Sequence, residues 1–156
     1  MGIKIGINGY GRIGRVILRI LMQNPEKFDV CGINLRKADI DYMVYLLKYD
    51  SVHGRAFETV EVTEDGFVAD GKAVKVLSER DPENLPWGEL GVDIVVESTG
   101  IFKTGELASK HIAAGAKKVI ITCPAKGEDI TIVMGVNDDQ YDKEKHHIVS
   151  NASCTT

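Results

Sequence analysis

The stretch IKIGINGYGRIGR, residues 3–15, decides the fold of this chain. It begins with a short β-branched run of strand length and passes directly into the glycine pattern GxGxxG at Gly9, Gly11 and Gly14. Apolar residues then recur at helical spacing over residues 13–21, which predicts an amphipathic helix. A GxGxxG pattern between a strand and a helix is typical of a turn that binds the pyrophosphate of a dinucleotide.

Each glycine of this pattern has a physical role in such a turn. Gly9 permits the tight turn, Gly11 lets the backbone approach a pyrophosphate, and Gly14 lets the helix pack on the strand. The N-terminus of the helix offers free N–H groups and the positive end of its dipole to the phosphates. We therefore expect NAD or NADP as the cofactor, and a turn without a ligand is the alternative interpretation.

Outside this unit, strand-length runs of valine and isoleucine alternate with helical patterns. Further strands are predicted at residues 30–34, 93–97, 119–122, 130–134 and 148–149, helices at residues 42–49 and 105–114, and a hairpin insertion around residues 57–77. Residues 79–87 are expected to form the longest irregular connection. Such alternation is typical of a parallel sheet covered on both faces. We predict one α/β domain over residues 1–156, a Rossmann-type doubly wound, mostly parallel sheet with a small antiparallel insertion.

The composition excludes several classes of protein. Lys and Arg number 19 against 23 Asp and Glu, so the net charge of −4 does not favour a nucleic-acid or anionic membrane partner. No apolar run is long enough to cross a membrane. The three cysteines are far apart and have no CxxC spacing, which favours reduced thiols and neither disulfides nor a metal site. We expect a cytoplasmic protein in which Cys31 and Cys123 are packing residues.

Asn34, Leu35 and Arg36 stand where the second strand ends, the place from which a carboxylate binds the adenosine ribose in NAD-specific sites. Leu35 occupies the position where an acidic residue is expected. The missing carboxylate removes repulsion against a 2′-phosphate, with which Arg36 is able to pair. Both cofactors stay open, because the cations here could form only a solvated loop face and Asp39 or Asp41 could still approach the ribose.

The chain closes with SNASCTT, residues 150–156, directly after the last predicted strand. Small polar residues at this point favour a sharp turn into a helix, with Ser153 as its N-cap. Cys154 would then lie in the first helical turn, where the dipole and the free N–H groups favour a thiolate and could hold an oxyanion. Cys154 is the candidate nucleophile, although a lone cysteine is more often a small buried apolar residue.

Five segments of the chain stand in a characteristic order: INGYGRIGR, LLKYDSVHG, VVESTGIF, KKVIITCPAK and IVSNASCTT. Together they resemble the glyceraldehyde-3-phosphate dehydrogenase family over residues 3–156, and SNASCTT is highly specific for it. The resemblance implies that Cys154 is the catalytic cysteine and that Ser153 and Thr155 contact substrate phosphate or the cysteine turn. It also implies cofactor contacts from Arg12, Ile13, Arg80, Ser98, Thr99, Gly100 and Thr122.

The resemblance further implies a reaction. The Cys154 thiolate attacks the aldehyde of glyceraldehyde 3-phosphate, hydride passes to the nicotinamide with the help of a histidine base, and inorganic phosphate releases the resulting thioester as 1,3-bisphosphoglycerate. A cysteine at the mouth of the dinucleotide cleft brings the nucleophile and the hydride acceptor together. The same resemblance implies a homotetramer. A dehydrogenase for erythrose 4-phosphate and a non-catalytic dinucleotide-binding module are the alternatives.

Two departures from the family pattern limit what the resemblance carries over. Leu35 replaces the aspartate of NAD-specific members, in a loop one residue longer than usual. The family's base histidine and its remaining phosphate-binding residues follow the CTT motif, in a second domain. We interpret all four histidines of this chain as non-catalytic, with His53 in the YDSVHG loop and His111, His146 and His147 on surface-like polar stretches. We expect the cofactor domain of a longer enzyme, without turnover on its own.

Overall fold

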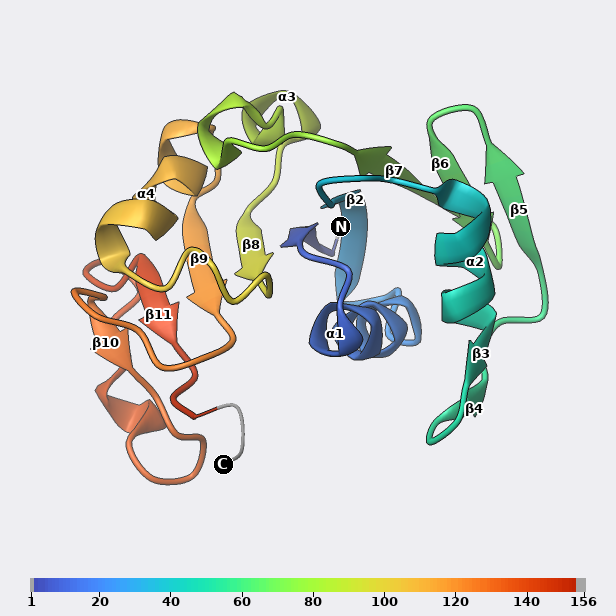
Figure 1. Cartoon of the computed structure of the whole chain (residues 1–156). Helices are drawn as coiled ribbons and strands as arrows, with labels where there is room; N and C mark the ends of the chain where they lie inside the picture. Colours follow the sequence, from blue (N-terminus) through green and yellow to red (C-terminus); the bar gives the residue numbers. More distant parts are fainter. Residues whose placement is uncertain (1, 154–156) are drawn as a thin grey trace.

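A computed structural model of the chain describes residues 2–153 and confirms a Rossmann-type α/β fold. Its main sheet has nine strands in the order β10-β11-β9-β8-β1-β2-β7-β6-β5 (Figure 1). The strands of this sheet are β1 (Ile3–Asn8), β2 (Phe28–Asn34), β5 (Val60–Thr63), β6 (Gly66–Ala69), β7 (Lys72–Leu77), β8 (Ile94–Glu97), β9 (Lys118–Ile121), β10 (Ile130–Thr131) and β11 (Ile148–Ser150).

The remaining elements connect these strands. The helices are α1 (Arg12–Met22), α2 (Ile40–Lys48), α3 (Trp87–Leu90) and α4 (Gly105–Ala113), with 3₁₀ turns η1 (Pro82–Asn84) and η2 (Asp138–Gln140). A separate two-stranded ribbon follows α2, made of β3 (Tyr49–Asp50) and β4 (Gly54–Arg55). Elements so short carry no hydrophobic period, which is why the sequence did not predict α3, β3 or β4.

The strands pair as the alternating pattern predicts. β1 lies between β2 and β8 and is parallel to both, and β9, β11 and β10 continue the parallel pairing beyond β8. The predicted insertion is antiparallel over β5, β6 and β7, and it extends the main sheet because β7 pairs in parallel with β2. The chain therefore winds outward from β1 in both directions, and β1 marks the point where the strand order reverses.

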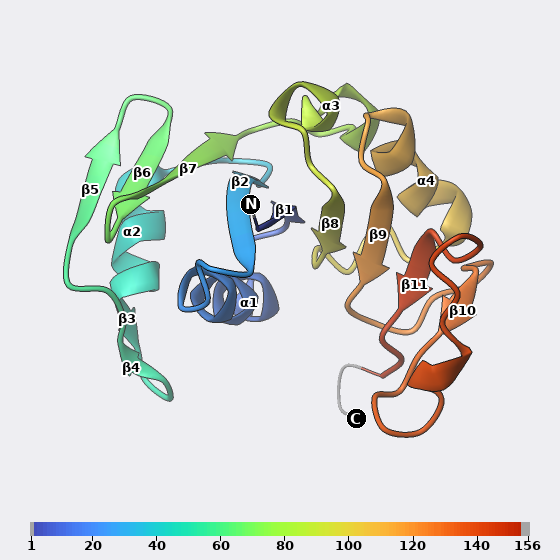
Figure 2. The ribbon, with the colours of Figure 1, turned by 180° about the vertical axis from the view of Figure 1, so that it is seen from behind.

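The helices cover the two faces of the sheet unequally. α1 packs on one face of β1 and β2, and α2 lies beside it over β5 and β6. Ile5, Ile7, Leu18 and Met43 share one buried cluster on this side of the sheet. α3 and α4 lie on the opposite face, over β8 and β9. Among the described residues no α-helix packs on the α1-side face of β9, β11 and β10, which instead lines an apolar groove of about 390 Å³. The strands β2, β7, β6 and β5 lie on one side of β1, and β8, β9, β11 and β10 lie on the other (Figure 2).

Trp87 explains why residues 79–87 are less irregular than expected. Its ring is fully buried and packs against Gly6 of β1, where an added Cβ would lie 2.9 Å from the ring. The segment before it forms η1, whose N-cap Asp81 accepts a hydrogen bond from the Glu83 backbone N–H. This connection is thus fixed to the centre of the sheet, and it carries Glu79 and Arg80 past the carboxyl ends of β2 and β1.

Candidate functional site

The glycine loop between β1 and α1 needs glycine at two positions. Gly9 has a φ of 105°, and a Cβ there would lie 2.8 Å from the backbone of Ser98 and Thr99. A Cβ on Gly14 would lie 2.2 Å from the Gly9 carbonyl oxygen, so α1 begins in direct contact with the turn. The loop, the start of α1 and the end of β8 are therefore packed at a distance that only glycine permits.

Hydrogen bonds hold this loop in place from two sides. The Ser98 hydroxyl donates to the carbonyls of Asn8 and Gly9, at 3.1 and 3.0 Å. The Tyr10 hydroxyl, nearly buried, donates to the Met43 carbonyl of α2 at 2.9 Å. Burial raises the pKa of the Tyr10 phenol, which keeps the hydroxyl protonated as a donor. These hydrogen bonds fix the loop to β8 and α2.

The N-terminus of α1 has the features of an anion site. Its N-cap residue is Gly11, which has no side chain to accept from the first N–H groups, and its first turn contains no acidic residue. By contrast, α2 is capped by Asp39 and α4 by Thr104. Gly11 is exposed, and a Cβ there would meet nothing within 4 Å. Uncapped N–H groups beside open space fit a pyrophosphate.

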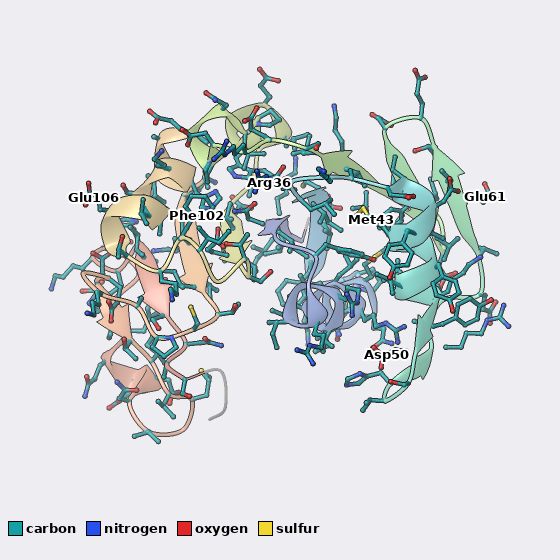
Figure 3. The ribbon with its side chains drawn as sticks, viewed as in Figure 1. Arg36, Met43, Asp50, Glu61, Phe102 and Glu106 are labelled. Atoms are coloured by element: carbon teal, nitrogen blue, oxygen red, sulfur yellow. The ribbon has the colours of Figure 1, made fainter. Side chains whose placement is uncertain are left out.

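A cavity of about 220 Å³ opens beside this loop at the carboxyl ends of the strands. It is lined by Asn8, Asn34, Leu35, Arg36, Glu79, Arg80, Thr99, Ile101 and Phe102. Five of these were predicted from the sequence, and they come from three separate segments. Arg36 and Phe102 belong to its walls on the β2 and β8 sides (Figure 3). The exposed surface of the cavity is mostly apolar, although six of its nine lining residues are polar, and this combination fits an adenosine moiety.

Four lining residues were not predicted: Asn8, Glu79, Ile101 and Phe102. Ile101 and Phe102 belong to the segment VVESTGIF, and this apolar pair in the loop after the strand is the sequence signal that could have identified them. Asn8 ends β1 with its side chain buried, and nothing in its sequence pattern distinguishes it from a packing residue.

The end of β2 presents no carboxylate to this cavity. Leu35 and Arg36 line it, whereas neither Asp39 nor Asp41 does. Asp39 is occupied as the N-cap of α2, where its Oδ1 accepts from the Tyr42 backbone N–H at 3.0 Å. The alternative in which Asp39 replaces the missing acid is therefore not favoured by the structure.

The remaining predicted cofactor residues lie around the cavity and the loop. Arg12 and Ile13 are exposed in the first turn of α1. Gly100 turns the chain after β8 with a φ of 71°. The Thr122 hydroxyl and backbone N–H, at the end of β9, both donate to the Glu97 carbonyl. All of these positions follow the carboxyl ends of parallel strands, which meet at one edge of the sheet.

The candidate nucleophile Cys154 and the neighbouring Thr155 lie outside the described residues. The chain reaches them from β11, which is parallel to β9, so residues 151–153 leave the sheet at the same edge as the glycine loop. Ala152 has a φ of 68°, which shows that the backbone turns sharply there. Ser153 is half-buried at the end of this turn.

The prediction that His111 is a surface residue was wrong. Its side chain is fully buried beneath β8, because α4 places it against Trp87 and Glu97. A residue within a polar stretch of a helix still faces the core when its spacing from other buried residues matches the helical period. Ala108 and His111, three residues apart, are both buried in α4. His53 and His147 are exposed, and His146 is half-buried.

The two described cysteines are packing residues, as predicted. Cys31 is half-buried against the cluster around Trp87, and Cys123 packs beside Ile121. Burial and the nearby Asp29 raise the pKa of the Cys31 thiol, which lowers its reactivity. Within residues 2–153 no cluster of His, Cys, Asp and Glu is arranged to hold a metal ion. None of the described helices has the length and apolar character needed to cross a membrane.

This fold and this site define a dinucleotide-binding domain of the Rossmann class, since the uncapped helix, the glycine loop and the cavity fit pyrophosphate and adenosine. The family described as glyceraldehyde 3-phosphate dehydrogenase, NAD binding domain, matches residues 3–105. The chain belongs to the glyceraldehyde-3-phosphate dehydrogenase family.

Similar proteins cover the whole chain. It is 58% identical to glyceraldehyde-3-phosphate dehydrogenase of Geobacillus stearothermophilus, over 100% of the chain and 46% of that protein. The protein of the same name from Streptomyces coelicolor is 56% identical over the same shares. That of Haemophilus influenzae is 54% identical over 100% of the chain and 45% of its own length. The chain spans about half the length of the curated relatives it matches.

Proposed function

We propose that this domain serves a phosphorylating glyceraldehyde-3-phosphate dehydrogenase, in which Cys154 is the nucleophile. The observation that carries the proposal is the common edge of the sheet, where the glycine loop, the cavity and the turn before Cys154 are brought together. The cofactor, when bound, accepts a hydride. The chain's own residues bind and orient that cofactor through the α1 N-terminus and the cavity walls.

In this proposal the Cys154 thiolate adds to the aldehyde carbon and forms a hemithioacetal. A base removes the hydroxyl proton as hydride leaves that carbon, and the product is a thioester. Inorganic phosphate then attacks the thioester carbonyl and expels the Cys154 thiolate, which yields the acyl phosphate. Ser153 and Thr155 flank the nucleophile and are assigned to the substrate phosphate or to the cysteine turn.

This function is tested by measuring the formation of reduced cofactor. The 156-residue chain alone is expected to bind dinucleotide and to give no turnover with glyceraldehyde 3-phosphate and phosphate, because the base histidine is assigned to a second domain. His111 does not replace it, since its side chain is fully buried. The protein joined to such a domain is expected to be active, and its Cys154→Ser variant inactive.

Two outcomes would contradict this assignment. Turnover by the 156-residue chain would show that no second domain is required. Preference for erythrose 4-phosphate over glyceraldehyde 3-phosphate, assayed side by side in the joined protein, would assign the other aldehyde substrate.

We further propose that Leu35 relaxes the choice between NAD and NADP. The exposed Arg36 beside it lines the cavity and is able to pair with a 2′-phosphate, whereas no carboxylate of the β2 end repels one. Leu35→Asp is expected to raise the ratio of NAD to NADP affinity by about tenfold, because a carboxylate binds the ribose hydroxyls and repels the phosphate. Parallel titrations with both cofactors measure the ratio, and an unchanged ratio would contradict the role of Leu35.

We also propose that the full protein is a homotetramer in the cytoplasm. Tyr42, Tyr45 and Tyr49 are 58, 57 and 50% exposed and form a continuous row, with ring centroids 6.4 and 5.3 Å apart. Aromatic residues are enriched at protein interfaces relative to the rest of the surface. The row therefore supports self-association of the full protein through the α2 region.

A further inference from the structure

A buried carboxylate lies beneath the cofactor site. Glu97 ends β8, its side chain is 1% exposed, and its two oxygens accept four hydrogen bonds. Oε2 accepts from Asn8 Nδ2 at 2.6 Å and from His111 Nε2 at 2.9 Å. Oε1 accepts from the Thr99 backbone N–H at 2.8 Å and from the Thr99 hydroxyl. Burying a carboxylate is costly unless donors surround it, and here they do.

Trp87 fixes the orientation of the histidine in this network. An indole nitrogen can only donate, so the 3.0 Å contact between Trp87 Nε1 and His111 Nδ1 makes Nδ1 the acceptor. The proton of the neutral ring therefore lies on Nε2, from which it is donated to Glu97. Hydrogen bonds are therefore donated in one direction, from Trp87 to His111 and from His111 to Glu97.

The network continues through two asparagines to the far wall of the cavity. Asn8 Oδ1 accepts from Asn34 Nδ2 at 2.8 Å. Asn34 also holds the backbone of Glu79 on both sides, accepting from its N–H at 2.8 Å and donating to its carbonyl at 2.9 Å. Both N–H donors of the Asn34 side chain are thereby used within the protein, so the predicted contact of Asn34 with the cofactor does not use them.

The endpoints of the network are the walls of the cofactor site. Asn8 precedes the glycine loop, Asn34 precedes Leu35, Glu79 precedes Arg80, and Thr99 lies in the loop after β8. These segments are far apart in the sequence, and the network links all of them beneath the cavity. Glu97 and His111 are themselves too deeply buried to touch a bound cofactor.

We propose that Glu97 and His111 are positioning residues, which set the geometry of the dinucleotide site by holding these four segments in register. The proposal rests on the cofactor site described above. A network whose donors and acceptors are all matched holds these segments in one low-energy arrangement, and cofactor contacts made by the segments act back on the network. The affinity for cofactor therefore depends on side chains that never contact it.

Glu97→Gln tests the proposal on the full chain. Every orientation of the new amide places its N–H₂ group against a donor, either the Thr99 backbone N–H or the pair from Asn8 and His111. We expect the Kd for NAD, measured by calorimetry well below the unfolding temperature, to rise about tenfold. Glu61→Gln is the matched control, because Glu61 is exposed on β5 at the far edge of the sheet (Figure 3).

The comparison of Kd with thermal stability separates positioning from structure. A lower Tm for Glu97→Gln with an unchanged Kd would reduce Glu97 and His111 to a structural role and overturn the proposal. Absence of NAD binding by the unmodified chain would contradict the cofactor site itself. The result for the unmodified chain thus distinguishes failure of the site from failure of the network.

A second measurement does not depend on the folding of the variant. The chain contains a single tryptophan, so the indole N–H of Trp87 gives one resonance in a nitrogen–proton correlation spectrum. Because this N–H donates to His111, saturation of the unmodified chain with NAD is expected to shift its resonance, although Trp87 is not part of the cavity wall. An unmoved resonance at saturation would overturn the proposed link.

Discussion

Replacing Gly14 with alanine is expected to destabilise the protein by about 3 kcal/mol and to lower its Tm by about 10 °C. A Cβ at this position would lie 2.2 Å from the Gly9 carbonyl oxygen and 2.9 Å from the Ser98 hydroxyl. The Gly9 carbonyl is backbone and accepts from Ser98, so it has no room to withdraw. Helix α1 would have to move away from β1 and β8.

The expected direction opposes helix propensity, which makes the result informative. Alanine is favoured over glycine inside a helix by about 1 kcal/mol, so propensity alone predicts a more stable protein. Thermal unfolding followed by circular dichroism measures which effect is larger. A Tm equal to or above that of the unmodified chain would contradict the close packing of α1 on the glycine loop.

Gly11→Ala is expected to weaken NAD binding by about 100-fold with little change in Tm. A Cβ at Gly11 meets nothing within 4 Å, and the φ of −75° suits alanine, so the fold has no reason to change. The methyl group would instead occupy the space beside the uncapped N–H groups of α1. Two charge-assisted hydrogen bonds to a pyrophosphate would be lost or lengthened.

The two glycine variants form a matched pair in one loop. Calorimetric titration with NAD gives the affinity of Gly11→Ala, and its melting curve is the control for folding. A variant that binds NAD as tightly as the unmodified chain would place the pyrophosphate elsewhere. Loss of stability in Gly11→Ala would show that the position has a packing role that the structure does not indicate.

Much of the fold could be predicted because its signals are local. The β-branched run before Gly9 and the helical spacing after it predict β1 and α1, and both are present. The absence of an acidic residue at Leu35 is likewise a fact of one position. These features depend on neighbours within a few residues, whose sterics and hydrogen bonding follow directly from the order of side chains.

The cavity and the buried network were harder to predict. Ile101 and Phe102 line the cavity only because the loop after β8 turns toward the end of β2. His111 stands among polar residues in the sequence, yet α4 turns it into the core. No period or motif connects it with Glu97 or Asn8, which lie 14 and 103 residues away.

The sequence by itself determined the glycine turn, the alternation of strands and helices, the family resemblance and the missing carboxylate at Leu35. Only the tertiary structure decided which residues share the cavity and how Trp87, His111, Glu97, Asn8 and Asn34 connect beneath it. The reason is physical: propensity and periodicity act along the chain, whereas these contacts arise when parallel pairing brings the ends of β1, β2 and β8 to one edge.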